Sequence, residues 1–352
     1  MVENTLGSCS QTNTAADPVS TAQISQLRFD VVAIGEALID FTEHGRSKSG
    51  MRLFEQNAGG APANVVAALA RLGLRTAFIG KVGDDGPGRF LQGTLADIGI
   101  NTDGMVLGND SFTTLAFVEI SDEGEREFSF ARKPGADTCL TEAELRHDLA
   151  AAGKVLHFGS LSLTNEPTRS TTLKAVEIAR SAGRIISFDP NYRPLLWSSE
   201  GAAVKQMLAG IKLANVVKVS IEEGLLLTGI ADPAAAAQQL LSMGPAVVVV
   251  TLGSCGALAA TSEGAVQVPE FPGKVVDTTG AGDSFWGGFL AAMLERGLTP
   301  NTIDLMKAYE LARVGNAVAS CCIGHRGGIP AMPDRAAVKK LLARNGEADL
   351  LQ

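Results

Sequence analysis

The sequence predicts a doubly wound α/β fold, in which a mostly parallel sheet is flanked by helices on both faces. From Phe29 onward, short apolar runs alternate with helical segments of about 10 to 15 residues. Connections of that length between strands favour right-handed crossovers and parallel pairing. The 352 residues, 45% of them hydrophobic, suffice for a large core in one domain or in two coupled ones.

The alternation starts with the apolar run DVVAIG at 30–35 and the Ala-rich segment APANVVAALARLG at 61–73, where Pro62 suits the first turn of a helix. A second pair of strand and helix is expected at 76–80 and 86–99. The later strand-like and helical segments are KVLHFG (154–159), TRSTTLKAVEIARSAG (168–183), RIISFD (184–189), GAAVKQMLAGIKLA (201–214), NVVKVS (215–220), IEEGLLLTG (221–229) and AVVVVTLG (246–253).

Two segments break the alternation and predict a small β lid. Residues 111–136 contain the strand-like runs FTTLAFVEI and EREFSF around the turn-like SDEGE, which favours an antiparallel hairpin. Residues 41–58 are too long and too polar for an ordinary βα loop, and we expect an irregular insertion there. Together the insertions would cover the carboxyl edge of the sheet as a lid. Surface decoration or a dimer contact is the alternative.

Composition excludes several classes of protein. The formal net charge of −8 and the pI near 5.2 argue against a nucleic-acid binder, which needs a concentrated basic face. The longest apolar runs, such as 246–250, are far shorter than the roughly 20 residues of a membrane span. Five cysteines without metal-ligand or disulfide spacing favour a reducing cytoplasm. Residues 1–28 lack the features of a targeting peptide, and we expect a flexible tail before a folded domain at 29–345.

The segment DTTGAGDSFWGG at 277–288 is the strongest indication of chemistry. It joins the strand-like KVV to an apolar helix, so its turn is expected at a helix N-terminus. Such a terminus presents unpaired N–H groups and a partial positive charge. Gly280, Ala281 and Gly282 would let an oxyanion approach this backbone without meeting a side chain. We therefore expect an anion cradle here.

Asp283 stands at the rim of this cradle, where a carboxylate would repel a bound phosphate unless it has another role. In phosphoryl transfer the incoming hydroxyl has to lose its proton, and Asp283 can be the base that takes it. Capping of the helix is the alternative role. Other nucleotide-binding templates fail, because the sequence contains no GxxxxGK[ST] motif and no protein-kinase motif set.

Two signatures stand in a fixed order, NAGGAPANVVAALARLG at 57–73 and DTTGAGDSF at 277–285. From residue 29 to about 335 the sequence resembles the PfkB, or ribokinase-like, family of carbohydrate kinases, which carries both. This resemblance implies a ribokinase-like α/β kinase domain with a small β lid. The stretches that resemble fructokinases within the family are GEALIDF (35–41), GGAPAN (59–64), ARKPGAD (131–137) and DPNYR (189–193).

The resemblance implies that Asp283 is the catalytic base, with Gly280, Ala281 and Gly282 as the anion hole. Asp40 would hold sugar hydroxyls, since an ionised carboxylate accepts several hydrogen bonds. The other implied residues of the sugar pocket are Gly59, Gly60, Asn64, Phe130 and Arg132. A turn before the helix is the alternative for the two glycines, and a capping role is the alternative for the asparagine.

The resemblance also implies a nucleotide side of the site. Arg193 would clamp the transferring phosphate, with a surface ion pair as the alternative. Glu223 in SIEE would organise Mg²⁺ indirectly through water, and Ser220 replaces the Asn of the family motif. The remaining implied residues are Thr251, Gly253 and Asn316 for ATP, with Ser220 beside them, and Asp277 and Thr279 for a K⁺ ion.

Together these residues imply an ATP-dependent sugar kinase, closest to a fructokinase that moves the γ-phosphate of ATP to the 6-hydroxyl of D-fructose. The alternatives are 2-keto-3-deoxygluconate kinase, ribokinase, a nucleoside kinase, or a non-catalytic sugar- or nucleotide-binding relative. The expected partners are a small sugar and ATP with Mg²⁺, without nucleic acid or membrane. Exposed lid strands could pair two subunits in a homodimer.

Overall fold

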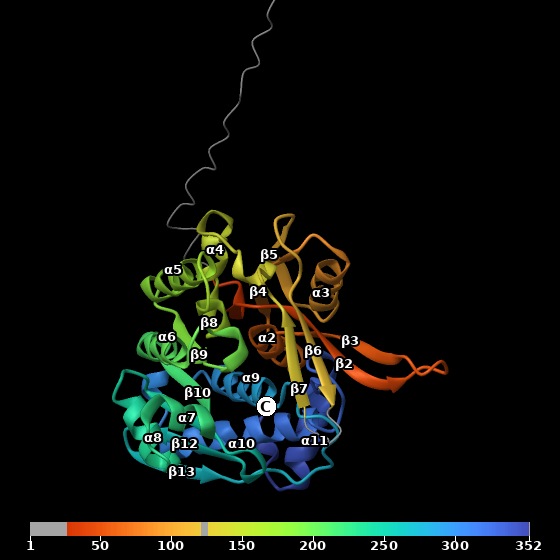
Figure 1. Cartoon of the computed structure of the whole chain (residues 1–352). Helices are drawn as coiled ribbons and strands as arrows, with labels where there is room; N and C mark the ends of the chain where they lie inside the picture. Colours follow the sequence, from red (N-terminus) through yellow and green to blue (C-terminus); the bar gives the residue numbers. More distant parts are fainter. Residues whose placement is uncertain (1–26, 121–125, 352) are drawn as a thin grey trace, which may run out of the picture.

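The computed structural model describes residues 27–120 and 126–351, which form two sheets with surrounding helices (Figure 1). The expected tail at 1–28 lies outside the described residues except for its last two. The strands are β1 Phe29–Ile34, β2 Leu38–Arg46, β3 Arg52–Gly59, β4 Thr76–Gly83, β5 Asn101–Gly108, β6 Leu115–Ile120, β7 Arg126–Ala131, β8 Gly153–Gly159, β9 Ile185–Asp189, β10 Val216–Ser220, β11 Val247–Thr251, β12 Ala257–Thr261 and β13 Gly264–Val268. The helices are α2 Ala61–Arg71, α3 Gly86–Asp97, α4 His147–Ala150, α5 Thr168–Ser181, α6 Glu200–Leu213, α7 Ile221–Thr228, α8 Pro233–Leu241, α9 Ala281–Glu295, α10 Leu305–Cys322 and α11 Arg335–Arg344.

The larger sheet has nine strands in the order β13-β12-β11-β10-β9-β8-β1-β4-β5. Neighbouring strands from β11 to β5 pair in parallel, while β12 and β13 add an antiparallel edge. Val31 and Ala33 of β1 belong to one buried cluster, and Val32 and Ile34 belong to another. Since both faces of this central strand are covered, the predicted doubly wound α/β architecture is confirmed.

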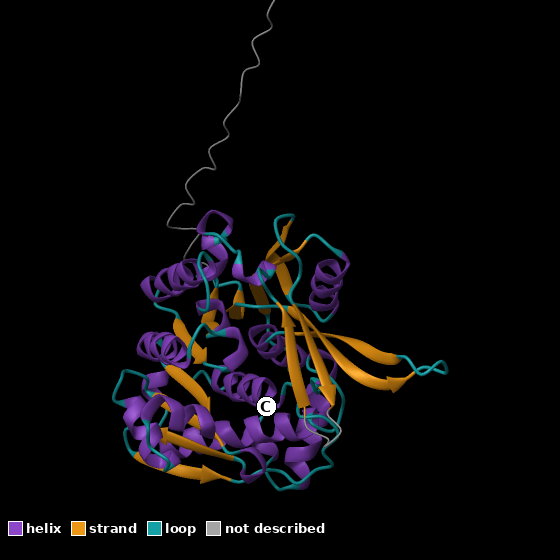
Figure 2. Cartoon of the chain, viewed as in Figure 1, coloured by secondary structure: helices purple, strands orange, loops and turns teal. Residues whose placement is uncertain are grey.

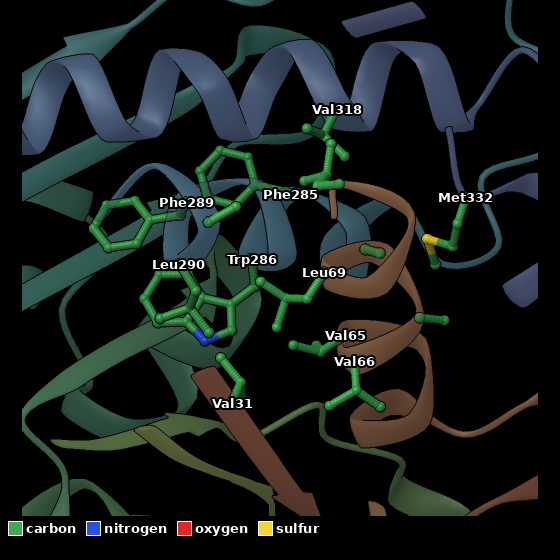
Figure 3. Packing of buried hydrophobic residues seen from close by; sticks show 14 of the residues in the cluster. Val31, Val65, Val66, Leu69, Phe285, Trp286, Phe289, Leu290, Val318 and Met332 are labelled. Atoms are coloured by element: carbon green, nitrogen blue, oxygen red, sulfur yellow. The ribbon is translucent and has the colours of Figure 1, made fainter. Parts of the chain in front are cut away.

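Helix α9, which follows the DTTGAG turn, is buried on several sides rather than on the one apolar face that the sequence predicted. Phe285, Trp286 and Phe289 are almost inaccessible to solvent, and they pack with residues of α2 and α10 (Figure 3). A Cβ atom on Gly287 would lie 2.6 Å from Ala68 of α2, and one on Gly288 would lie 2.7 Å from Val318 of α10. The two glycines thus allow close approach of three helices, which fixes where the turn before α9 points.

The smaller sheet has the order β3-β2-β6-β7, and β2 and β3 project from the body of the molecule (Figures 1 and 2). The antiparallel pairing of β6 and β7 confirms the hairpin expected within 111–136. The insertion expected at 41–58 is a second antiparallel hairpin, formed by β2 and β3 in the same small sheet, rather than an irregular segment. Both of its faces are only partly buried, so its polar residues gave no apolar alternation. β2 joins the hairpins by parallel pairing with β6, where Phe41 stacks on Phe117 at 5.3 Å between ring centroids.

Candidate active site

A cavity of about 820 Å³ lies between the smaller sheet and the carboxyl ends of the parallel strands. It contains most of the residues that the sequence analysis selected. Those that line it are Asp40, Gly60, Asn64, Phe130, Arg193, Ser220, Glu223, Thr251, Thr279, Gly280, Ala281, Gly282 and Asp283. Gly59, Arg132, Gly253, Asp277 and Asn316 do not line it. The carboxyl edge of a parallel sheet is the usual binding site in such folds.

The GAGD turn lies at the N-terminus of α9, as predicted. Gly280 is the residue before the helix and adopts the left-handed conformation, with φ of 75°. This backbone angle favours glycine, and a Cβ atom there would lie in tight contact with Gly328 Cα, at 3.3 Å. Ala281, Gly282 and Asp283, the first residues of α9, line the cavity, and of these the N–H of Ala281 donates to the Thr278 carbonyl at 3.2 Å. This arrangement can bind an anion.

Asp283 is buried, and both oxygens of its carboxylate accept a hydrogen bond from a side-chain amide. Asn64 Nδ2 donates to Oδ2 at 2.7 Å, and Asn191 Nδ2 donates to Oδ1 at 2.9 Å. Among the described residues, no side-chain hydrogen bond caps the start of α9, so the capping alternative for Asp283 does not apply. Burial raises the pKa of Asp283, as does the Asp189 carboxylate, while the Lys218 ammonium opposes the rise. A raised pKa suits a base that has to accept a proton.

Asp40 projects from β2 into the same cavity but has no hydrogen-bond partner among the described residues. Burial raises its pKa to about 7, Arg193 opposes this rise, and Asp283 adds to it. Gly59 stands beside Asp40, and a Cβ atom there would collide with the carboxylate. Gly59 therefore makes room for the acid. Its neighbour Gly60, with φ of 110°, lies against the backbone oxygen of Glu36.

Glu36 is a buried acid that the sequence analysis quoted in GEALIDF without selecting it. Its Oε1 accepts the N–H of Ala61 at 2.9 Å and so anchors the start of α2, while Oε2 has no partner among the described residues. Burial raises the pKa of Glu36 to about 7. A charged residue directly after an apolar strand was the signal that could have revealed it.

Asn191 was also missed, although it lies in the DPNYR stretch that supplied Arg193. It is the single residue other than glycine with positive φ in the described ranges, at 44°, and that backbone aims its amide at Asp283. The N–H of Asn191 donates to Asp189 Oδ1 at 3.1 Å. Arg193 itself is exposed, lines the cavity, and donates to the carbonyl of Tyr192 at 3.1 Å.

Phe130 and Arg132, on either side of the last residue of β7, have different surroundings. Phe130 lines the cavity, as expected for a residue above a sugar. Arg132 is buried outside it, where its guanidinium contacts Asp137 Oδ2 at 2.6 Å and also donates to Thr164 Oγ1 and the Leu161 carbonyl. These contacts link the base of the hairpin to the segment after β8, so the structure gives Arg132 a supporting position rather than a lining one.

Ser220 and Glu223 form a capping box at the start of α7. The two carboxylate oxygens of Glu223 accept backbone N–H groups, from Tyr192 at 2.6 Å and from Ser220 at 2.7 Å. Among the described residues no group of three or more acidic, His or Cys side chains could hold a metal. An indirect contact of Glu223 with a metal through water is compatible with this geometry, because each of its oxygens keeps a lone pair after accepting one N–H.

Of the residues implied for the nucleotide and for K⁺, some line the cavity and others lie outside it. Thr251 and Thr279 line the cavity. Asn316 is buried on α10, where its amide donates to the carbonyl of Pro269 at 2.8 Å. Asp277 accepts the N–H of Thr279 at 2.9 Å and that of Gly327 at 3.0 Å, which ties the turn to a loop before the C-terminal helix.

Comparison with known proteins defines the class. Residues 28–335 match the pfkB family carbohydrate kinases, and the chain belongs to this family. It is 41% identical over 320 residues to probable fructokinase-4 of Arabidopsis thaliana, covering 90% of this chain and 97% of the relative.

Solved structures agree with this assignment. Fructokinase from Xylella fastidiosa with bound ATP superposes with a TM-score of 0.83 at 34% identity, over 90% of this chain and 99% of that one. Fructokinase from Vibrio cholerae O395, bound to fructose, ADP and calcium, gives 0.80 at 33% identity, over 89% and 99%. The predicted family and the ribokinase-like fold are therefore confirmed. Within the described ranges, no helix is both long enough and apolar enough to cross a membrane.

Proposed function

We propose that this carbohydrate kinase is an ATP-dependent fructokinase that transfers the γ-phosphate of ATP to the 6-hydroxyl of D-fructose. The observation that carries the proposal is the position of Asp283, which is clamped by two amides beside the GAG turn in a cavity shared with Asp40. Similarity to fructokinases over nearly the whole chain supports the choice of sugar.

In the proposed reaction, Asp283 takes the proton of the attacking hydroxyl while the N–H groups of the turn stabilise the charge on the phosphoryl oxygens. Asn64 and Asn191 each occupy one acceptor site of the carboxylate, and further lone pairs remain for the substrate hydroxyl. Asp40 accepts hydrogen bonds from other hydroxyls of the sugar. The amide clamp therefore holds the base in one orientation before the sugar arrives.

Mg²⁺ and K⁺ belong to this proposal. Glu223 would reach Mg²⁺ through water, with the carboxylate held in place by the backbone N–H groups of Tyr192 and Ser220. When bound with ATP, the metal would neutralise charge on the phosphates. Asp277 and Thr279 would support a K⁺ ion beside the turn. Comparing turnover in potassium and sodium chloride at equal ionic strength tests this part separately.

The four-stranded sheet is proposed to act as the lid of a single kinase domain at 29–345. Phe130 supports this role, because it places an aromatic ring of β7 at the cavity. A homodimer formed through the lid strands and a location in the cytoplasm are further parts of the proposal. Sedimentation analysis tests the first, and imaging of a tagged chain tests the second.

The deciding experiment is a sugar panel assayed for ADP release, with Asp283→Asn as the matched inactive variant. Fructose should give the highest kcat/KM, and the variant should lower kcat about 10²- to 10⁴-fold. Higher turnover of 2-keto-3-deoxygluconate or ribose would overturn the choice of sugar. Absence of any phosphorylation that depends on Asp283 would favour a binding protein instead.

A further inference from the structure

Lys218 is a buried cation in the middle of strand β10, and neither the family signatures nor the proposed reaction uses it. Its strand neighbours Val217 and Val219 belong to one core cluster, while Val216 belongs to the other, beneath α9. Side chains alternate along a strand, so Lys218 points with Val216 to the face that α9 covers. Its side chain is 6% exposed and lines the cavity.

The ammonium of Lys218 reaches the cradle. A Cβ atom built on Gly282 would lie 3.2 Å from Lys218 Nζ. The described residues give this nitrogen one acceptor, Asp189 Oδ2 at 2.6 Å. An ammonium has three N–H donors, so two remain at the wall of the cavity without a protein acceptor. Buried donors normally have partners, which indicates that a ligand supplies the missing ones.

The charges around Lys218 point to an anionic ligand. Burial tends to lower the pKa of Lys218, but the carboxylates of Asp189, Glu223 and Asp283 raise it above its ordinary value, so the amine stays protonated. These three acids oppose the entry of a phosphate. Of the described residues that line the cavity, Arg193 and Lys218 are the cations, and Arg193 is exposed.

We propose that Lys218 is a catalytic residue that binds the phosphoryl group in transfer, together with the N–H groups of the GAG turn. This inference rests on the proposed kinase reaction. In that step the sugar oxygen forms a bond to the γ-phosphorus, and the bond from this phosphorus to the β,γ-bridging oxygen breaks. The electron pair stays on ADP and the hydroxyl proton passes to Asp283. Lys218 neither gains nor loses a proton and acts by its charge and its two N–H donors.

A purely structural role for Lys218 predicts different behaviour. Asp189 also accepts the N–H of Asn191, which in turn holds Asp283, so Lys218 could act only by neutralising Asp189. Removing Lys218 alone leaves a buried unpaired carboxylate and would destabilise the fold under either role. The double variant Lys218→Met with Asp189→Asn removes both charges while it preserves volume and the acceptor for Asn191. It therefore separates the two roles.

The test measures binding and turnover together. Calorimetry gives the affinities of wild type, the double variant and the surface control Lys205→Met for ADP and for a non-hydrolysable ATP analogue with an imido link between the β- and γ-phosphates. We expect the double variant to bind ADP within about twofold of wild type, to lose about tenfold or more of its preference for the analogue, and to lose about 100- to 1,000-fold in kcat.

Three outcomes would contradict the inference. A double variant with the kcat of the wild type would show that Lys218 only neutralises the charge of Asp189. An unchanged ratio of analogue to ADP affinity, in a wild type that binds both nucleotides, would overturn the role of Lys218 and leave the kinase assignment intact. A wild type that binds neither nucleotide would overturn the proposed function and this inference with it.

Discussion

The two acids of the cavity stand in contrasting surroundings. Asp283, on the helical side, has both carboxylate oxygens engaged by amides, and α9 beneath it is packed between two other helices. Asp40, on the smaller sheet, has no hydrogen-bond partner among the described residues, and its strand is only partly buried. The comparison teaches that the group proposed for proton transfer is organised in advance, whereas the group proposed for sugar binding is left for the ligand to satisfy.

The largest effect is expected from the substitution of Asp283, the acid that is held by two amides. Asp283→Asn keeps the shape of the side chain but removes the base, so kcat should fall about 10²- to 10⁴-fold. Asparagine offers one acceptor to the two amides of the clamp, so thermal stability should fall by about the value of one hydrogen bond, although burial raises the pKa of Asp283 and favours loss of its charge. ADP release and thermal melting measure the two effects. A variant that is fully active and properly folded would exclude Asp283 as the base.

The next largest effect is expected from the substitution of Asp40, the acid whose carboxylate has no hydrogen-bond partner among the described residues. Asp40→Asn should reduce kcat/KM for the sugar about 10- to 100-fold, because hydrogen bonds to a charged acceptor are lost. Nucleotide affinity should stay within about twofold, since Asp40 contacts no group of the phosphate cradle. Calorimetry with ADP and steady-state kinetics measure these values. Equal loss of nucleotide and sugar affinity would contradict the division between the two acids.

Removing one half of the amide clamp should give an intermediate effect. Asn191→Gly deletes the donor to Asp283 Oδ1 and relieves the positive φ of 44°. We expect kcat to fall about tenfold, as for one hydrogen bond to a charged group, with little loss of stability. The pH profile of kcat should shift as well, because the clamp acts on the base. A loss confined to KM would argue against a positioning role.

Ionisation of Asp40 predicts a pH dependence of sugar use. The pKa of Asp40 is raised by burial to about 7, so it is largely protonated in the free protein below that pH. The ionised form accepts more hydrogen bonds, and kcat/KM for the sugar should rise with pH through about 7 and level off above it. The same assay on Asp40→Asn should lose this component. A profile that the substitution leaves unchanged would assign the pH dependence to another group.

Glu36 predicts a pH effect on stability. Its pKa is 4.5 in the unfolded reference and about 7 in the fold, because of burial. Between these values the folded protein binds more protons, so the free energy of unfolding falls as pH rises from about 4.5 to about 7, and then levels off. Glu36→Gln should reduce this dependence in thermal melts, while the exposed Glu177→Gln should not. Equal profiles for the two variants would contradict the assignment.

The smallest effect is expected at the edge of the smaller sheet. Glu55 lies 3.2 Å from His44 and 3.5 Å from Arg326, and these exposed pairs contribute at most about 1 kcal/mol. Glu55→Gln should leave stability and sugar KM nearly unchanged. A rise in KM of tenfold or more would show that this link between the sheet and the loop at Arg326 is important for binding.

The sequence was sufficient for the regular parts of the fold and for the cradle. Periodic apolar runs located the parallel strands, and the small residues before Asp283 located the helix N-terminus. The pairing of β2 with β6 could not be predicted, because it joins segments about 75 residues apart and the faces of β2 are only partly buried. Long-range pairing of this kind leaves no local pattern.

Some residues of the cavity were not selected from the sequence, because they stand next to residues that gave a stronger signal. Asn191 stood beside Arg193, and its importance comes from a backbone angle that no composition reveals. Lys218 interrupts a run of valines, and that was a usable signal, since a charged residue inside a buried strand requires a partner. Arg132, which the resemblance implied for the sugar pocket, lies beyond the end of β7 at Ala131, and its guanidinium binds Asp137 instead of lining the cavity.

The placement of one acid on the smaller sheet and the other on a helix affects how fast ATP is lost to water. Asp40 belongs to the smaller sheet and Asp283 to α9, so a molecule must extend from one to the other to engage both. Fructose carries enough hydroxyls to do this, whereas a single water beside Asp283 leaves Asp40 untouched. We expect ATP to be hydrolysed slowly when no sugar is present, because a water molecule beside Asp283 makes no contact with Asp40.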